Sequence, residues 1–142
     1  MKQNLFRCTI LFGVLMTTLV SAQTPLHDAV KKNNLNGVKT YTTQEYLEVR
    51  DDQKNTPLML ATQNNNHQAA EILILAGADV NAKNAIEDTP YLLAGAQGYN
   101  EILKLTLEHG ANIKDTNRSG GTAIIPAAEK GHPETVKLLL AA

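Results

Sequence analysis

Apolar residues recur along this chain in short helical patterns that are separated by polar turns. Leu26 and Ala29 lie three positions apart, and Ala70, Leu73 and Ile74 follow the same helical spacing. The intervening segments are rich in Asn, Asp and Gly, which favour turns. The pattern predicts helices over residues 24–33, 35–43, 56–64, 67–75 and 101–107, with others starting near Thr89 and Thr122 and a last one over 131–140. Residues 47–50 are expected to be extended.

A six-residue phrase starts the first helix of each pattern. It is Thr-Pro-Leu-His-Asp-Ala at residues 24–29, Thr-Pro-Leu-Met-Leu-Ala at 56–61 and Thr-Pro-Tyr-Leu-Leu-Ala at 89–94. The fourth copy, Thr-Ala-Ile-Ile-Pro-Ala at 122–127, is more divergent. The copies follow one another after 32, 33 and 33 residues. A fixed period of this size is typical of repeat proteins.

The phrase has a local physical logic. The Thr hydroxyl accepts a hydrogen bond from a free amide of the first turn, so Thr is a good N-cap. Pro at the first helical position loses no hydrogen bond and already has a helical φ. The small Ala lets a neighbouring backbone approach closely. We therefore expect each copy to open a short helix that packs against another element.

Composition supports stacked small helices. The chain has 142 residues, enough for one domain, with 4% aromatic residues and no Trp, so its core must consist of Leu, Ile, Val and Ala. The net charge is −1, which gives no basic field for a nucleic acid.

These features resemble the ankyrin-repeat family. The Thr-Pro-Leu-His-x-Ala phrase, Gly131-His132 and the segment Gly-Ala-Asp-Val-Asn-Ala at 77–82 all match its pattern. The resemblance covers residues 24–142 and implies an all-α solenoid of helix-turn-helix units with short β-turn fingers. The repeats are expected at 24–55, 56–88, 89–121 and 122–142, the last one incomplete.

Three residues depart from the family pattern. Lys54 and Glu87 occupy finger positions that usually hold Gly, which costs up to about 1 kcal/mol each if the positive φ persists. Pro126 falls within the first turns of its helix, where it removes a backbone donor. Because the surrounding phrase is similar to a variant of bacterial ankyrin proteins, we interpret Pro126 as a variation and not as a break in the helix.

The first 22 residues differ from the rest and have the features of a secretory signal peptide. Lys2 and Arg7 precede a mainly apolar run over residues 8–20, and Ser21-Ala22 provides small residues for cleavage after Ala22. The run is too short to span a bilayer readily, although an uncleaved anchor or a buried helix are alternatives. We predict a signal peptide over 1–22, an ankyrin domain over 23–142, and export to the periplasm or the exterior. Cleavage would remove Cys8, the only cysteine.

Candidate chemistry is sparse. His27 and His132 occupy positions where the resemblance itself implies His, bonded to neighbouring loop backbone. No pair of the four histidines has the i, i+4 spacing of a helical metal motif, and no nucleophile elbow or phosphate loop occurs. Asp51 and Asp52 suit a turn better than a calcium or acid–base site. Asn117-Arg118-Ser119 matches a glycosylation acceptor, which a periplasmic protein would not normally use. We expect no enzyme activity, cofactor or metal.

The resemblance implies a binding surface formed by finger tips and the exposed face of each first helix. Carried over by register, the finger residues are Asp52, Gln53, Asn55, Ala85, Ile86, Asp88, Arg118 and Ser119. The helix residues are Lys31, Lys32, Gln63, Asn64, Ala96, Gln97, Glu129 and Lys130. Each of them is alternatively a merely solvated position. Ile86 is the sharpest candidate, because an apolar tip residue either packs on its neighbour or contacts a partner.

The sequence thus predicts an exported protein-binding module, with neither nucleic-acid binding nor stable membrane insertion after cleavage. A structural role is the alternative, because Leu138, Leu139 and Leu140 end the chain without the polar outer face usual for a terminal repeat. On this hypothesis the chain is a fragment of a longer array, or its last helix stacks on another copy.

Overall fold

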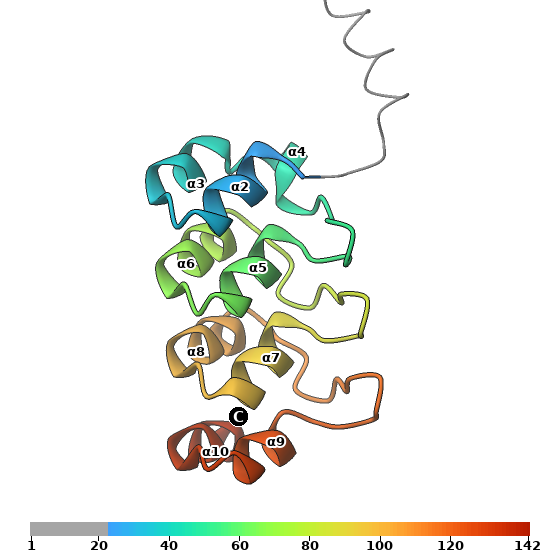
Figure 1. The fold of residues 1–142 in the computed structure, drawn as a ribbon. Helices are drawn as coiled ribbons and strands as arrows, with labels where there is room; N and C mark the ends of the chain where they lie inside the picture. The colour runs from blue at the N-terminus through green and yellow to red at the C-terminus, as the bar shows by residue number, and fades with distance from the viewer. Residues whose placement is uncertain (1–22) are drawn as a thin grey trace, which may run out of the picture.

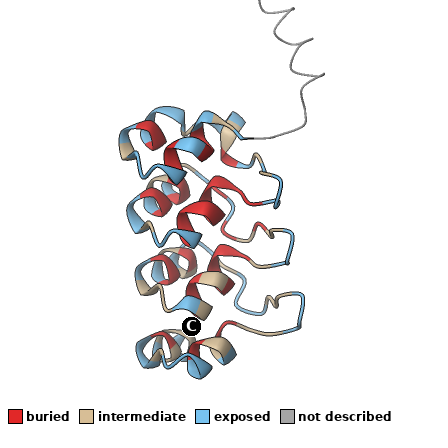
Figure 2. Ribbon diagram, in the orientation of Figure 1, coloured by how far each residue is buried: buried red, intermediate tan, exposed pale blue. Residues whose placement is uncertain are grey.

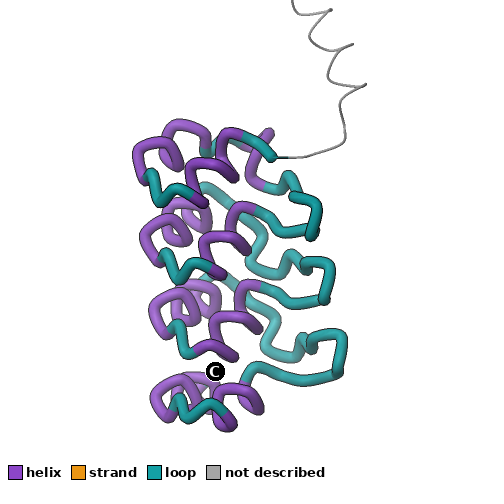
Figure 3. Tube along the Cα trace, viewed as in Figure 1, coloured by secondary structure: helices purple, strands orange, loops and turns teal. Residues whose placement is uncertain are grey.

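The computed structural model describes residues 23–142, so the predicted signal peptide lies outside the described residues (Figure 1). Within this range the chain forms helices and turns but no β-strand (Figure 3). The helices are α2 (Pro25–Lys31), α3 (Leu35–Tyr41), α4 (Gln44–Leu47), α5 (Pro57–Gln63), α6 (His67–Leu75), α7 (Pro90–Gln97), α8 (Asn100–Glu108), α9 (Ile124–Glu129) and α10 (Pro133–Ala141).

Four helix pairs stack into two parallel columns. Helices α2, α5, α7 and α9 form one column, which we call the inner helices, and α3, α6, α8 and α10 form the other, which we call the outer helices; each helix contacts the next in its column. The loops that link successive pairs project to one side of the stack as fingers (Figure 3). The all-α solenoid expected from the sequence is confirmed, with Thr24, Thr56 and Thr89 at equivalent places in successive layers.

The Thr-Pro phrase starts the first three inner helices as predicted. The hydroxyls of Thr24, Thr56 and Thr89 accept hydrogen bonds from backbone amides three residues later, at 3.3, 3.2 and 3.1 Å. Each Thr has extended backbone angles, and the following Pro is the first helical residue. The cap satisfies an amide that the helix leaves unpaired.

The fourth copy corrects this prediction. Helix α9 starts at Ile124, one residue late, and Thr122 does not cap it. In the earlier repeats, the backbone amides of Asp28, Leu60 and Leu93 donate to the Thr carbonyl at 3.2, 3.1 and 3.0 Å. Pro126 occupies the equivalent position and has no amide to donate. Starting the helix later leaves Pro126 in the first turn, and the helix continues to Glu129 as expected of a variant.

A second correction concerns residues 47–50, which were expected to be extended. Leu47 instead ends the four-residue helix α4, and its side chain is buried. The helical turn carries Leu47 into the core, a burial worth about 1.5–3 kcal/mol. Around it, the Gln44 side chain donates to the Ala76 carbonyl at 3.2 Å, and the Glu48 carboxylate accepts from the Asp79 amide at 2.8 Å.

The core is continuous through the stack. Leu26, Leu58, Leu73, Ile102 and Leu103 are at most 1% exposed, and the buried residues lie where the two columns and successive layers meet (Figure 2). Small residues such as Ala61, Ala69 and Ala94 are also fully buried, which permits close helix approach. No helix pair hides its apolar face alone, so stability must come from stacking.

The turns within the helix pairs share one backbone conformation. Asn33, Asn65, Gly98 and Gly131 all have positive φ, at 53°, 49°, 77° and 74°. Asn tolerates this region better than most residues, as the sequence predicted for Asn65. The turn also links layers, because the side-chain amide of Asn66 donates to the side-chain oxygen of Asn33 at 2.6 Å.

Candidate interaction surface

Each finger is built around the same turn. The side-chain oxygens of Asp51, Asn84 and Asn117 each accept two backbone hydrogen bonds, from the residues two and four positions later, at 2.9–3.1 Å. These Asx turns close the five-residue segments 51–55, 84–88 and 117–121, which we call the finger turns. Asp and Asn suit this role because their short side chains bond the backbone two residues on.

The second and third residues of each finger turn form its tip. The tip residues are Asp52 and Gln53, Ala85 and Ile86, and Arg118 and Ser119, all of which are exposed. Their side chains make no hydrogen bond or salt bridge to other described residues. Ile86 is 54% exposed, so about half of this apolar side chain is open to solvent. One backbone frame therefore presents acidic, apolar and basic tips in succession.

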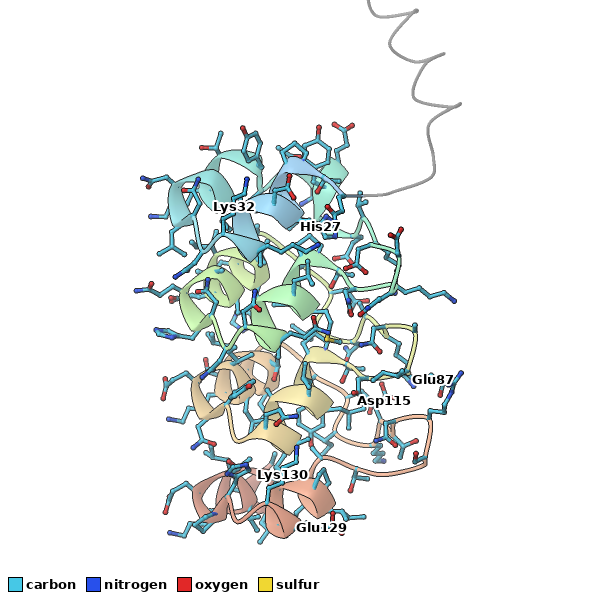
Figure 4. The ribbon with its side chains drawn as sticks, viewed as in Figure 1. His27, Lys32, Glu87, Asp115, Glu129 and Lys130 are labelled. Carbon is cyan, nitrogen blue, oxygen red and sulfur yellow. The ribbon has the colours of Figure 1, made fainter. Side chains whose placement is uncertain are left out.

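The fourth residue of each turn has positive φ, at 60° for Lys54, 64° for Glu87 and 73° for Gly120. The strained conformation expected for Lys54 and Glu87 does persist. Glu87 lies on the finger side of the stack, near the loop that carries Asp115 (Figure 4).

The fifth residue of each turn lies inward. Asn55 was expected among the partner contacts, but it is 2% exposed. Its side chain bonds Asp51, Gln63 and Asn84, each at 3.3 Å, so it joins finger, inner helix and next finger. We therefore leave Asn55 out of the surface. Asp88 is half-buried, and burial raises the pKa of its carboxyl.

The fingers are also joined side by side. The Arg50 guanidinium donates to the Lys83 carbonyl, and the Lys83 ammonium pairs with the Asp115 carboxylate at 3.1 Å. The Ala85 amide donates to the Gln53 carbonyl of the preceding finger at 3.0 Å. A single exposed ion pair contributes only about 0–1 kcal/mol to stability, so the fingers are held in a row by these hydrogen bonds and the ion pair together.

The expected helix residues lie at the C-terminal ends of the inner helices. Lys31, Lys32, Gln63, Asn64, Gln97, Glu129 and Lys130 are exposed, and Ala96 is half-buried. Lys32 and Lys130 mark opposite ends of this row (Figure 4). The Lys130 ammonium donates to Gln97 at 3.1 Å across the last layer boundary.

Two hollows open at the first layer boundary. The finger hollow has a volume of about 290 Å³, and Lys31, Asp51, Asp52, Gln53, Leu60 and Gln63 line it. The turn hollow has the same volume, and Lys31, Asn33, Asn64, Asn65, Asn66 and Gln68 line it. Lys31 borders both hollows. Five of the expected contact residues line them, Asn55 aside.

The carboxyl of Asp51 is held within its finger. Burial alone would raise its pKa, but the hydrogen bonds from the Asn55 backbone and side chain and the Gln53 backbone lower the pKa overall. Asp51 therefore carries a full negative charge at neutral pH. The turn role expected for Asp51 accounts for its geometry.

His27 is a structural residue. Its Nδ1 accepts hydrogen bonds from the Thr24 hydroxyl at 2.8 Å and the Thr24 amide at 3.4 Å, and its Nε2 donates to the Asn55 carbonyl at 3.4 Å. It thus ties the first inner helix to the first finger, as expected (Figure 4). Burial lowers the pKa of His27, and the Asn55 carbonyl and the Asp51 charge offset this only in part.

The other histidines lie apart from it. His67 and His109 are exposed at the start and the end of outer helices, and the His132 ring packs against the Gly98 turn of the preceding repeat. Among residues 23–142, no three His, Cys, Asp or Glu side chains gather as a metal site would require.

Sequence reasoning missed the contribution of Asn84 and Asn117. The repeat period could have identified them, because Asp51, Asn84 and Asn117 are spaced by 33 residues. The hollows had no comparable signal, because they depend on how side chains from two layers and a finger come together.

The fold agrees with what the chain is similar to. The family profile described as "Ankyrin repeats (3 copies)" matches residues 7–84 and 74–142. The chain belongs to the ankyrin-repeat family. Ankyrin repeats generally act as protein-interaction scaffolds without catalysis.

Two solved structures are similar to this chain in both sequence and fold. An ankyrin repeat domain from Acinetobacter baumannii AYE is 54% identical, with a TM-score of 0.78. Another ankyrin repeat protein is 44% identical, with a TM-score of 0.76. Each match covers 82% of this chain but 60% of the solved one, so the ankyrin chain described here spans less than two thirds of their length. In residues 23–142, no helix is both long and apolar enough to cross a bilayer.

Proposed function

We propose that this ankyrin chain is a non-catalytic binding module that holds a partner protein with its finger tips and inner helices. One observation carries the proposal. Three fingers share a single hydrogen-bonded frame, yet their exposed tips differ in charge and polarity. A rigid frame with variable exposed tips suits recognition, because ordering it on binding costs little entropy.

The opposite surface has a different character. On the outer helices, Glu101 pairs with Lys104 at 3.4 Å and Glu134 with Lys137 at 2.8 Å, each three residues apart. Such exposed pairs are typical of a solvated helix face and contribute little to stability. This contrast favours the finger side as the binding side.

The test compares two exposed apolar residues on opposite sides. Ile86 is 54% exposed on a finger tip, and Leu75 is 69% exposed on outer helix α6. We expect Ile86→Asp and Leu75→Asp to unfold at similar temperatures, whereas only Ile86→Asp loses the protein that crosslinks to the chain in its native compartment. Equal losses, or retention by Ile86→Asp, would contradict the proposed surface.

The proposal includes export. It is supported by the basic start, the apolar run and the small residues before Gln23. We expect the exported form to begin at Gln23, which N-terminal sequencing after fractionation would reveal. Recovery of Met1 in the cytoplasmic fraction would contradict export.

A second candidate function is structural, by association through the last repeat. Ile113 and Ile125 are 42% and 53% exposed, whereas their equivalents Val80 and Leu92 are 4% and 3% exposed. A hollow of about 570 Å³ lies beside Ile113, between helices α8 and α10. If a second copy covers the exposed Ile113 and Ile125, the parent chain should be a dimer. Ile125→Lys should then convert this dimer into a monomer, as measured by light scattering. A monomer before the substitution would exclude this function.

A further inference from the structure

The two hollows at the first layer boundary lie on either side of Lys31, and we treat them together as one polar site. Lys31 borders both, and the site follows the junction of α2 and α5 from the finger turn to the turns within the helix pairs. In the finger hollow, finger residues and inner-helix residues line the same space.

The lining of this site is dominated by carboxamides. Gln53 and Gln63 face the finger hollow, and Asn33, Asn64 and Gln68 face the turn hollow. Gln63 already donates to Asn55 and Asn33 already accepts from Asn66, whereas the carboxamides of Gln53, Asn64 and Gln68 bond no other described side chain. A carboxamide offers both donors and an acceptor, as a peptide group does, so a row of them can pair with an extended main chain. In helices and sheets, the backbone N–H and C=O groups are already paired with one another. An extended peptide segment has unpaired backbone groups, so it is the ligand that these carboxamides could bind.

The charges give the site a direction. Asp51 and Asp52 lie at the finger end, and Lys31 lies between the hollows. Among the described residues, neither Asp52 nor Lys31 has a hydrogen-bond or salt-bridge partner for its charged group. The Asp51 carboxylate is fixed by its turn, so the pair presents negative charge with little reorganisation. A basic side chain of a ligand would be attracted to this end.

Other ligand classes match the site less well. Enclosed apolar pockets suit small molecules, but each hollow is smaller than about 300 Å³, and the apolar lining residues Leu60 and Val30 are almost fully buried. The carboxylates of Asp51 and Asp52 would repel nucleic-acid phosphates.

We propose that this site binds an extended peptide segment of the partner, with an Arg or Lys side chain between Asp51 and Asp52 and the main chain paired to the carboxamides. The inference rests on the proposed binding function and names the kind of segment recognised. Asp52 and Asn64 then act as specificity-determining contacts at the two ends of the site.

The experiment uses a library of random linear peptides, probed with the purified chain. We expect selected peptides to carry Arg or Lys at one fixed position. In fluorescence anisotropy with a selected peptide, Asp52→Asn should weaken binding about two- to fivefold and abolish the Arg or Lys preference. Asn64→Ala should weaken binding by up to about tenfold without changing that preference.

Glu134→Gln is the matched control. It removes one exposed carboxylate from outer helix α10 at the other end of the stack, outside both hollows and away from the proposed binding surface, and should leave peptide affinity unchanged. Thermal melts of all three variants would establish that each is folded. Equal weakening by Glu134→Gln would overturn the inference, because it would indicate a diffuse charge effect.

Two other outcomes would overturn the inference and leave the proposed function standing. The peptides selected from the library could show no preference for Arg or Lys. Alternatively, the purified chain could bind glycans on an array but none of the peptides. If Ile86→Asp still abolishes partner crosslinking in either case, the finger side binds its partner by another route. Loss of both effects would remove the proposed function as well.

Discussion

At the scale of single residues, hydrogen bonds to side chains decide where helices begin. Thr24, Thr56 and Thr89 cap their helices because each hydroxyl meets an unpaired amide. The sequence predicted these caps from residue type alone. It could not predict the late start of α9, because that depends on one backbone bond that Pro126 is unable to make.

His27 makes stability depend on pH. Its pKa is lowered from 6.5 in the fold, so the unfolded chain binds more protons below that pH. Stability from the neutral imidazole is complete above about pH 6.5 and is lost as pH falls toward the lowered pKa. The Asp51 carboxyl, whose pKa is lowered from 3.8, affects a more acidic window. The raised pKa values of Glu48 and Asp88 act in the opposite direction.

We therefore predict a difference between two pH profiles. His27→Gln should be less stable than the parent at pH 7, by about 1–3 kcal/mol, because buried hydrogen bonds are lost. Between pH 7 and pH 5 it should lose less stability than the parent in urea titrations. His109→Gln, at an exposed position, should follow the parent profile. Parallel profiles for parent and His27→Gln would contradict this assignment.

At the scale of elements, the fingers show how local geometry limits residue choice. The sequence identified Lys54 and Glu87 as departures from Gly, and both have the expected positive φ. It did not identify helix α4, since a four-residue helix has too few positions for a periodic pattern and is stabilised by contacts with the second repeat. Elements set by short-range chemistry were predictable, and those set by the next layer were not.

The positive-φ residues of the fingers predict stability changes of opposite sign for two kinds of substitution. Lys54→Gly and Glu87→Gly should each stabilise the chain by up to about 1 kcal/mol, because Gly adopts positive φ without the steric penalty. Gly120→Ala should destabilise it by a similar amount. A Cβ at Gly120 would meet no atom within 4 Å, so its effect reports backbone strain alone. Differential scanning calorimetry would measure all three, and matching signs would refute the strain interpretation.

At the scale of the whole molecule, each layer depends on its neighbours. Stability in such a stack is the sum of repeat and interface contributions. The repeat period predicted the order of layers, and the resemblance to the ankyrin-repeat family implied fingers between them. The two hollows, in contrast, followed only from the packing of α2, α5 and the first finger.

The contact between the third and fourth repeats tests this coupling. Gly98 and Gly131 have φ of +77° and +74°, but a Cβ on Gly98 would lie 2.8 Å from the His132 ring, whereas one on Gly131 would meet nothing within 4 Å. Gly98→Ala should therefore be less stable than Gly131→Ala by about 1–3 kcal/mol. Hydrogen exchange should accelerate in α9 and α10 of Gly98→Ala and change little in α5. Equal stability of the two variants would show that the layers are not coupled through this contact.

The finger turns separate two kinds of change. Their hydrogen bonds come from the backbone and from one side chain at the base, and the tip side chains take no part. A lineage that exchanges tip residues can therefore acquire a new partner while its folding free energy stays constant. Divergence in recognition then proceeds without the loss of stability that usually restricts new mutations.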